Sequence, residues 1–302
     1  MLDGFVCLLK PPGPTSHDMV AYVRRLLGIK RAGHTGTLDP LAAGVLVIAI
    51  GRATRLIQYL DTTKTYLGEI TFGLATDTLD AGGNITANEP AQFVRQDLET
   101  VLLEFTGAIS QVPPMVSAVK WRGHRLYDLA RKGVEVDRPA RPVLIHKLKL
   151  LSFNPERTYP RSLIKCTCSA GTYVRTLAAD IGTALNCSSY LSFLLRTQSG
   201  PFTISTSLTP DEFETYLGQA LPSRWLCPPQ EALSNLSAVA LGQEDVNLFK
   251  HGNPVMLEES MTLQSKVMSV RVCDRDGIFL GVGQLCAGGL TKYRLQPKVV
   301  FN

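Results

Sequence analysis

The chain has 302 residues, 45% of them hydrophobic, which is enough for about two domains with substantial cores. It contains no apolar run of 18 residues, and its first residues show no signal-cleavage pattern, so the sequence argues against a membrane-spanning or secreted protein. The seven cysteines follow neither a disulfide framework nor zinc-ligand spacing, and we therefore expect reduced thiols, no metal and a cytoplasmic location.

The net charge of +5 is unevenly distributed along the chain. Residues 115–149 carry nine Lys or Arg against three acids, and residues 1–60 carry seven against three. Residues 61–114 carry two against eight. This distribution indicates a face that binds a polyanion, although solvated loops would have the same composition.

The first 30 residues predict a strand followed by a helix. The strand covers residues 5–10 and ends at a proline-rich turn. Ser16 then has the character of an N-terminal cap, the apolar positions 20, 23 and 27 recur near helical spacing, and Gly28 is a stop signal.

Residues 31–51 place one carboxylate, Asp39, directly ahead of a run that must be buried. Pro40 disfavours helical geometry for Asp39, so we expect this aspartate on a bend. Residues 45–50 are continuously apolar and rich in β-branched side chains, which is typical of a strand buried on both faces. From composition alone, the bend could equally be a polar turn whose aspartate accepts hydrogen bonds from neighbouring amides.

The middle of the chain predicts a strand, an acidic turn, a helix and then a basic segment. Tyr66 begins a strand that continues through residues 67–72, and the acidic turn at 76–80 lacks the spacing of a calcium loop. Residues 97–105 have the i, i+3, i+4, i+7 pattern of an amphipathic helix. The most basic segment follows, and its cations are expected to contact phosphates rather than bases: Lys120, Arg122, Arg125, Arg131, Lys132, Arg138 and Arg141.

The last part of the chain predicts a strand over 162–170, a helix entered through 171–177, and a linker over 210–233. Short strands and turns follow in 235–302, with an Asp-Gly turn at 276 and 277. We expect two domains, at 1–225 and 235–302.

Several of these stretches resemble the motifs of the tRNA pseudouridine synthase B (TruB) family. The string G-H-T-G-T-L-D-P-L-A-A-G-V-L around Asp39 is similar almost letter for letter to the family's catalytic motif. The strings K-P-P-G-x-T-S, D-T-T-K-T-Y, G-T-Y-V-R-T-L and L-L-R-T-Q-S-G-P-F resemble further motifs. Leu195 departs from the last one, where the family usually has an arginine.

The resemblance implies three catalytic residues. Asp39 would be the essential carboxylate, acting at the sugar C1′ or C2′ or at uracil C6. Tyr66 would stack on the target uracil, with a role in proton transfer left open, and Arg175 would pair with Asp39. A guanidinium within about 4 to 6 Å of a carboxyl group lowers the pKa of that group by roughly 1 to 3 units, so we expect Arg175 to keep Asp39 ionised.

It also implies five substrate-binding residues. His34 would occupy the space that a flipped base leaves in the RNA, while Tyr173 and Leu194 would line the uracil pocket. Lys10 would support the site, and Lys120 would contact a phosphate.

The implied fold is α+β: a pseudouridine synthase fold with a mixed, mainly antiparallel sheet flanked by helices, plus a small β-rich PUA-like domain. The implied activity converts uridine to pseudouridine at position 55 in the T stem-loop of tRNA, through a flipped-out base. This isomerisation needs no cofactor. We expect a monomer that binds tRNA and no membrane.

Three other functions remain open from the sequence. The basic face would also suit a non-catalytic RNA-binding or RNA-folding factor, or a synthase that depends on a guide RNA. A hydrolase is less favoured, because glycoside hydrolysis normally needs a second carboxylate and none is paired with Asp39 in the sequence.

Overall fold

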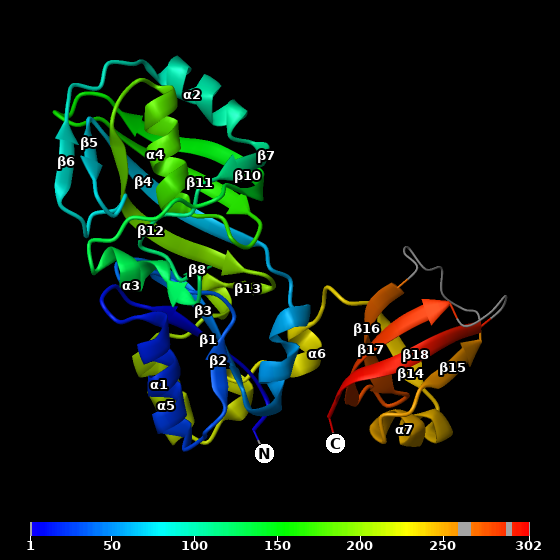
Figure 1. Ribbon diagram of the computed structural model, residues 1–302. Helices are drawn as coiled ribbons and strands as arrows, with labels where there is room; N and C mark the ends of the chain where they lie inside the picture. The colour runs from blue at the N-terminus through cyan, green and yellow to red at the C-terminus, as the bar shows by residue number, and fades with distance from the viewer. Residues whose placement is uncertain (1, 259–266, 288–291, 302) are drawn as a thin grey trace.

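The computed structural model describes residues 2–258, 267–287 and 292–301, which form a large body built on one sheet and a smaller C-terminal sheet (Figure 1). The large sheet contains nine strands: β1 Gly4–Lys10, β2 Ala32–His34, β3 Ala43–Ile50, β4 Lys64–Phe72, β7 Gly107–Gln111, β10 Arg141–Asn154, β11 Arg161–Cys168, β12 Ser189–Ser199 and β13 Phe202–Thr203. Two hairpins lie outside it: β5 Leu74–Thr76 with β6 Ile85–Asn88, and β8 Lys120–Trp121 with β9 His124–Arg125.

The main path of the large sheet runs β1-β3-β12-β4-β11-β10-β7. Its pairs are antiparallel except β3 with β12, which meet in parallel at Gly44 and Arg196. Gly44 has a φ of +110°, and a side chain there would overlap the Arg196 backbone. This one parallel pair therefore needs glycine at its closest approach. The predicted mixed, mainly antiparallel sheet is confirmed.

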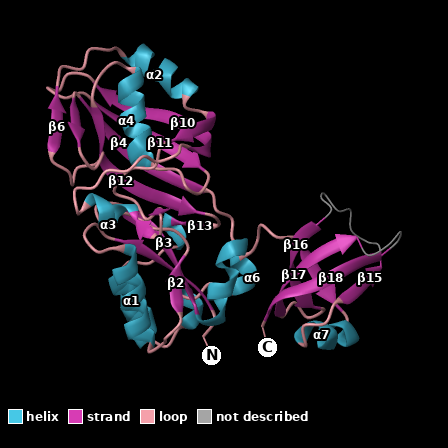
Figure 2. Ribbon diagram, viewed as in Figure 1, coloured by secondary structure: helices cyan, strands magenta, loops and turns pink. Residues whose placement is uncertain are grey.

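Helices cover the sheet where the apolar pattern requires it. In the large body they are α1 Ser16–Leu27, α2 Arg95–Glu104, α3 Leu126–Ala130, α4 Val174–Ala184, α5 Pro210–Gly218 and α6 Pro229–Ala232, with 3-10 turns at Gly51–Tyr59, Ile204–Thr206 and Pro222–Arg224. Figures 1 and 2 show α2 and α4 over the same side of β4, β10 and β11. Leu98 of α2 and Leu177 of α4 join Ile164 of β11 in one buried cluster.

Two details of the sequence prediction are wrong. The cap of α1 is Thr15 rather than Ser16, because the Thr15 side chain accepts the Asp18 N–H in a capping box. Residues 210–233 are not a linker: Phe213 of α5 and Trp225 are buried against each other with ring centroids 5.5 Å apart. The backbone of Phe5 also exchanges hydrogen bonds with Cys227, which attaches this segment to β1.

The C-terminal sheet has the order β14-β16-β17-β18-β15, with β14 Ala238–Leu241, β15 Val255–Glu258, β16 Val267–Asp274, β17 Phe279–Ala287 and β18 Lys292–Val300. The predicted Asp-Gly turn joins β16 to β17, and Gly277 has a φ of +83°. The helix α7 Gln243–Lys250, which the sequence analysis missed, buries Val246 and Phe249 against the sheet.

Apolar side chains join the C-terminal sheet to the large body. Val282, Val299 and Phe301 share one buried cluster with Phe5 and Val45 of the large sheet. The Arg52 guanidinium also lies over the Phe301 ring, 5.1 Å from its centroid. The two sheets therefore pack on a common core.

Candidate active site

Asp39 lies in the loop between β2 and β3, and its neighbours on both sides are anchored. Leu38 is buried, and its backbone N–H and carbonyl both bond to the Ser16 hydroxyl, at 2.7 and 2.9 Å. The Pro40 carbonyl accepts the Gly13 N–H at 2.8 Å. Asp39 is thus held on the predicted bend by contacts to α1 and to the turn after β1.

Lys10 contributes to this anchoring from beneath the loop. Its side chain is only 1% exposed, and Nζ donates to the carbonyls of Pro11, Pro14 and Pro40 at 2.8, 2.8 and 3.1 Å. Burial lowers the pKa of Lys10 to about 8, while nearby Asp39 opposes this fall. Lys10 was expected among the substrate-binding residues, but its ammonium group contacts the loop and does not line the pocket described below.

Arg175, on the first turn of α4, reaches Asp39. Its Nε lies 3.0 Å from Asp39 Oδ2, and its side chain is 4% exposed against 38% for Asp39. The guanidinium also donates to the Thr78 carbonyl at 3.0 Å and the Val116 carbonyl at 2.8 Å, and lies 3.4 Å from Asp80 Oδ2. Arg175 therefore connects α4 to three separate segments: the Asp39 loop, the turn at 78–80 and the loop at Val116.

The electrostatic balance at Asp39 differs from the expectation that its arginine would dominate. Burial raises the pKa of the Asp39 carboxyl, Arg175 opposes this rise, and Asp80 reinforces it. The net effect is a pKa above the ordinary aspartate value. The second carboxylate on the same guanidinium, which the sequence did not associate with the site, accounts for part of this difference.

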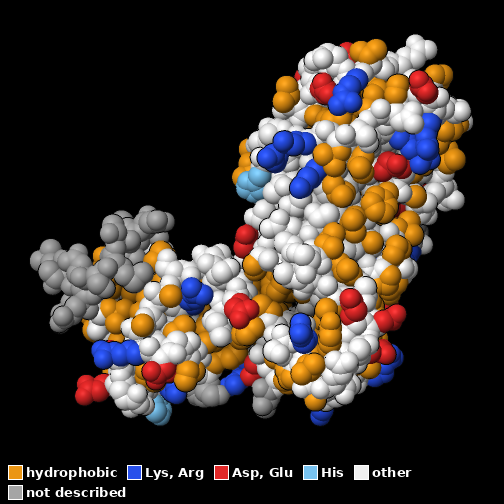
Figure 3. Space-filling view, turned by 180° about the vertical axis from the view of Figure 1, so that it is seen from behind, with side chains coloured by type: hydrophobic (Ala, Val, Ile, Leu, Met, Phe, Trp, Pro, Cys, Tyr) orange, Lys and Arg blue, Asp and Glu red, His pale blue; other side chains and the backbone are white. Residues whose placement is uncertain are grey.

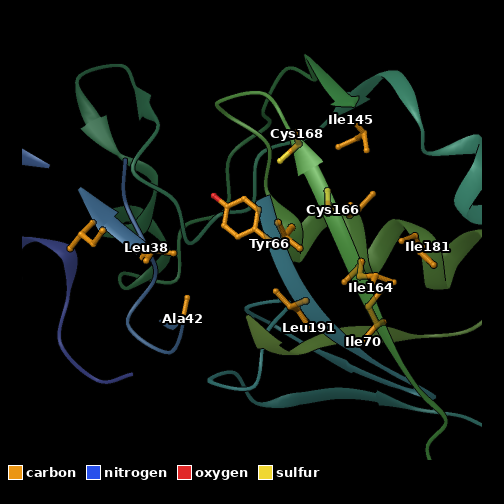
Figure 4. Close-up of a cluster of buried hydrophobic side chains, with 14 of the residues drawn as sticks. Leu38, Ala42, Tyr66, Ile70, Ile145, Ile164, Cys166, Cys168, Ile181 and Leu191 are labelled. Atoms are coloured by element: carbon orange, nitrogen blue, oxygen red, sulfur yellow. The ribbon is translucent and has the colours of Figure 1, made fainter. Parts of the chain in front are cut away.

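A pocket of about 260 Å³ opens beside the ion pair. Tyr66, Tyr173 and Leu194 line it together with Asp39 and Arg175, so the structure brings five of the expected residues to one cavity. Figure 4 shows the Tyr66 ring at the margin of the buried cluster, with Cys166 and Leu191 on the sheet side and Leu38 across from them. Burial raises the pKa of Tyr66, so its phenol keeps its proton at neutral pH.

His34 and Lys120 lie outside this pocket lining. His34 ends β2 and is half-buried; burial lowers its pKa, and its Nδ1 has no hydrogen-bond partner among the described residues. Lys120 is exposed in the short β8–β9 hairpin, where the Arg122 guanidinium lies 4.6 Å from the Trp121 ring centroid. Of the other cations in this segment, Arg138 pairs with Glu135 at 3.3 Å.

Two further cations, neither of them predicted from the sequence, line the pocket. Arg196 of β12 is 1% exposed and donates to the carbonyls of Val45, Thr37 and Gly36 at 2.7, 3.2 and 3.1 Å. Lys64 of β4 is 7% exposed. The spacing of Lys64 from Tyr66 could have identified it, because residues two positions apart on a strand point to the same face of the sheet.

Within the described residues, no group of three or more His, Cys, Asp or Glu side chains could hold a metal ion. No described helix is both long and apolar enough to span a membrane.

Comparisons with known proteins give consistent matches over the chain. Residues 24–174 match the model of the TruB family pseudouridylate synthase N-terminal domain, and residues 237–301 match that of the pseudouridine synthase II TruB C-terminal domain. The tRNA pseudouridine synthase B of Moorella thermoacetica is 46% identical over 95% of this chain and 93% of its own. That of Symbiobacterium thermophilum is 51% identical over 83% of this chain and 82% of its own.

Solved structures share the fold. A Cbf5 complex with Nop10 and Gar1 matches with a TM-score of 0.75 and 25% identity, over 99% of this chain and 85% of the other. An H/ACA ribonucleoprotein bound to a substrate RNA containing 2′-deoxyuridine matches with a TM-score of 0.76 and 23% identity, over the same shares of the two chains. The expected pseudouridine synthase fold is therefore confirmed.

Proposed function

The chain belongs to the TruB family of pseudouridylate synthases, and on that premise we propose that it isomerises uridine 55 in the T stem-loop of tRNA to pseudouridine. The observation that carries this proposal is the Asp39–Arg175 ion pair at the wall of a pocket lined by two tyrosines. The identity to tRNA-modifying relatives is 46 to 51%, against 25% to the Cbf5 chain, which favours a stand-alone enzyme over a guide-dependent one.

The chemistry requires a flipped base. The bond from N1 to C1′ breaks, uracil turns, and a bond from C5 to C1′ forms; C5 loses a proton and N1 gains one. Atoms and electrons balance within the substrate, so the reaction uses no cofactor. Extrusion of the base costs a few kcal/mol, and a loop presents it more readily than a duplex does.

The site residues then take distinct roles. Asp39 acts on the reacting nucleotide, and Arg175 positions it and stabilises its ionised form. Tyr66 stacks on the uracil and, because burial raises its pKa, keeps its phenolic proton. Tyr173 and Leu194 exclude water around the base. His34, beside the pocket, occupies the space vacated in the T loop.

The RNA is bound over a wider surface. Lys120 and its basic segment contact phosphates, and the domain at 235–302 extends the contact beyond the catalytic domain at 1–225. His146, Lys147, Lys149 and Lys165 are exposed on β10 and β11, and Figure 3 shows Lys, Arg and His side chains gathered at that end of the large body. We expect a cytoplasmic monomer. Size-exclusion chromatography with light scattering would test the oligomeric state.

An unmodified tRNA transcript tests the function. The wild-type protein alone should form pseudouridine in the T arm, and Asp39→Asn should abolish the product while retaining RNA binding. Binding without product from the wild type would support the non-catalytic RNA-binding factor instead. Activity only with an added guide RNA would support the guide-dependent reading. Release of free uracil would indicate a hydrolase.

A further inference from the structure

Four cationic side chains with little exposure surround the Asp39 loop and its pocket: Lys10, Lys64, Arg175 and Arg196. Three of them have protein partners. Lys10 and Arg196 each donate to three carbonyls, and Arg175 contacts two carbonyls and two carboxylates. Among these four, only the Lys64 side chain has no hydrogen-bond or ion-pair partner within the described part of the chain. Lys64 lines the pocket, so its ammonium group is open to the pocket, where a bound anion would supply the partner that the protein does not.

The position of Lys64 indicates where that ligand would lie. Lys64 lines the same pocket as Asp39, and it precedes Tyr66 by two residues on β4. The two side chains therefore share one face of the strand, about 6 to 7 Å apart along it. A methyl group on Gly36 would lie 3.6 Å from Lys64 Cε and 3.7 Å from an Arg196 terminal nitrogen, so both cations flank the Gly36 turn.

The charges around Lys64 favour an anion. Burial and Arg196 lower the pKa of Lys64 to about 8, and Asp61 and Cys168 oppose this fall. Asp61 already accepts the Thr63 N–H at 2.8 Å. Arg175 and Asp80 belong to the other end of the pocket, beside Asp39. The part of the pocket around Lys64 thus carries two positive charges, on Lys64 and Arg196. The one nearby acid, Asp61, accepts a hydrogen bond from a backbone N–H.

We propose that Lys64 binds a phosphate adjoining the flipped uridine and thereby positions the nucleotide between Tyr66 and Asp39. The proposal rests on the function proposed above and extends it to a specific contact. A nucleotide held at Tyr66 through its base and at Lys64 through its phosphate presents its sugar to the carboxylate. A uracil carbonyl would also accept a hydrogen bond from the ammonium group, but it would not compensate the positive charge.

The test measures single-turnover pseudouridine formation on a T-arm stem-loop RNA, with neutral methylphosphonate placed at one linkage at a time. The modified linkages are the one 5′ of the target uridine, the one 3′ of it, and one in the distal stem. The proteins are the wild type, Lys64→Met, Lys64→Arg and, as a matched loss of one positive charge, Lys120→Met. RNA affinity is measured separately by filter binding.

On natural RNA at subsaturating enzyme, the single-turnover rate constant of Lys64→Met should be about 10- to 100-fold lower than that of the wild type, the range for a hydrogen bond to a charged group. A neutral linkage beside the target should reduce the wild type to the level of Lys64→Met and leave that variant unchanged. Lys120→Met should lose affinity on the natural RNA and on each RNA neutralised beside the target. Lys64→Arg should recover most activity and keep it between pH 7 and 9, where the wild type loses affinity as Lys64 deprotonates.

Thermal unfolding separates this role from a structural one. Because burial disfavours the charged form of Lys64, its removal should leave the melting temperature of Lys64→Met equal or higher, whereas loss of a structural contact would lower it. The proposal is overturned if the rate of Lys64→Met is below that of the wild type by the same factor on every RNA, whichever linkage is neutral. It is also overturned if Lys64→Met is as fast as the wild type on natural RNA. If the wild type makes no pseudouridine on natural RNA, the proposed function fails instead.

Discussion

Replacement of Arg175 by methionine should destabilise the protein strongly, because the guanidinium is 4% exposed and has four partners. Methionine fills similar space but leaves the Asp39 and Asp80 carboxylates and the carbonyls of Thr78 and Val116 without this donor. Removal of one member of a buried ion pair typically costs about 3 to 5 kcal/mol. With a urea m-value of about 1 to 3 kcal/mol per molar, the unfolding midpoint should fall by about 1 M or more.

Arg161→Met is the matched control. Arg161 lies 3.0 Å from Glu69, the same separation as in the Arg175–Asp39 pair, but its side chain is 38% exposed. An exposed pair contributes about 0 to 1 kcal/mol, so this variant should unfold near the wild-type midpoint. Urea titrations followed by circular dichroism at pH 7 compare the two variants with the wild type.

The pH dependence provides a second check. Without Arg175, the pKa of Asp39 should rise further above its ordinary value, so the native variant binds more protons than its unfolded chain. Its stability relative to the wild type should therefore fall as the pH rises and recover as the pH falls and Asp39 becomes protonated. A loss below about 1 kcal/mol at pH 7, no larger than that of Arg161→Met, would refute the account of this ion pair.

Three further predictions concern other parts of the molecule. Gly44→Ala should cost about 2 kcal/mol or more in unfolding free energy, since a methyl group there would overlap the Arg196 backbone, whereas Gly218→Ala, with open space around it, should be neutral or stabilising. The unfolding free energy of the wild type should rise by up to about 3 kcal/mol relative to that of Lys64→Met between about pH 8 and 10.5, because the unfolded wild-type chain binds more protons than the native one in this range. The same pH dependence of the unfolding free energy for both proteins, measured by urea titration, would contradict this. Deletion of residues 235–302 should expose apolar groups around Phe5 and Val45, measurable as increased dye binding and aggregation; a soluble, fully stable fragment would contradict the shared core.

Local sequence patterns predicted several elements of the large body, because period and capping are properties of neighbouring residues. The strand at 45–50, the helix ending at Gly28 and the helix near 97–105 follow from such patterns. The region 210–233 was misjudged for the same reason: its prolines and acids read as a linker, while the burial of Phe213 and Trp225 depends on partners far away in the chain.

The candidate site was only partly accessible from the sequence. Asp39 and Arg175 were associated through the resemblance to a family, since no local pattern relates residues that far apart. Asp80 lies in the turn between β5 and β6, Lys64 on one face of β4, and Arg196 on β12. Each reaches the site only because strand pairing sets its position. Their effect on the pKa of neighbouring groups could not be anticipated without that geometry.

The parallel contact of β3 with β12 also has a kinetic consequence. It pairs Gly44 with Arg196, which are separated by most of the sequence of the large body. Arg196 then donates hydrogen bonds to the carbonyls of Gly36 and Thr37, close to Asp39 in the same loop. Contacts between residues so distant in sequence form slowly, because a long chain segment must close first. During refolding from urea, helical signal should therefore recover before turnover does, and the interval between them would report the time at which the catalytic loop acquires its final shape.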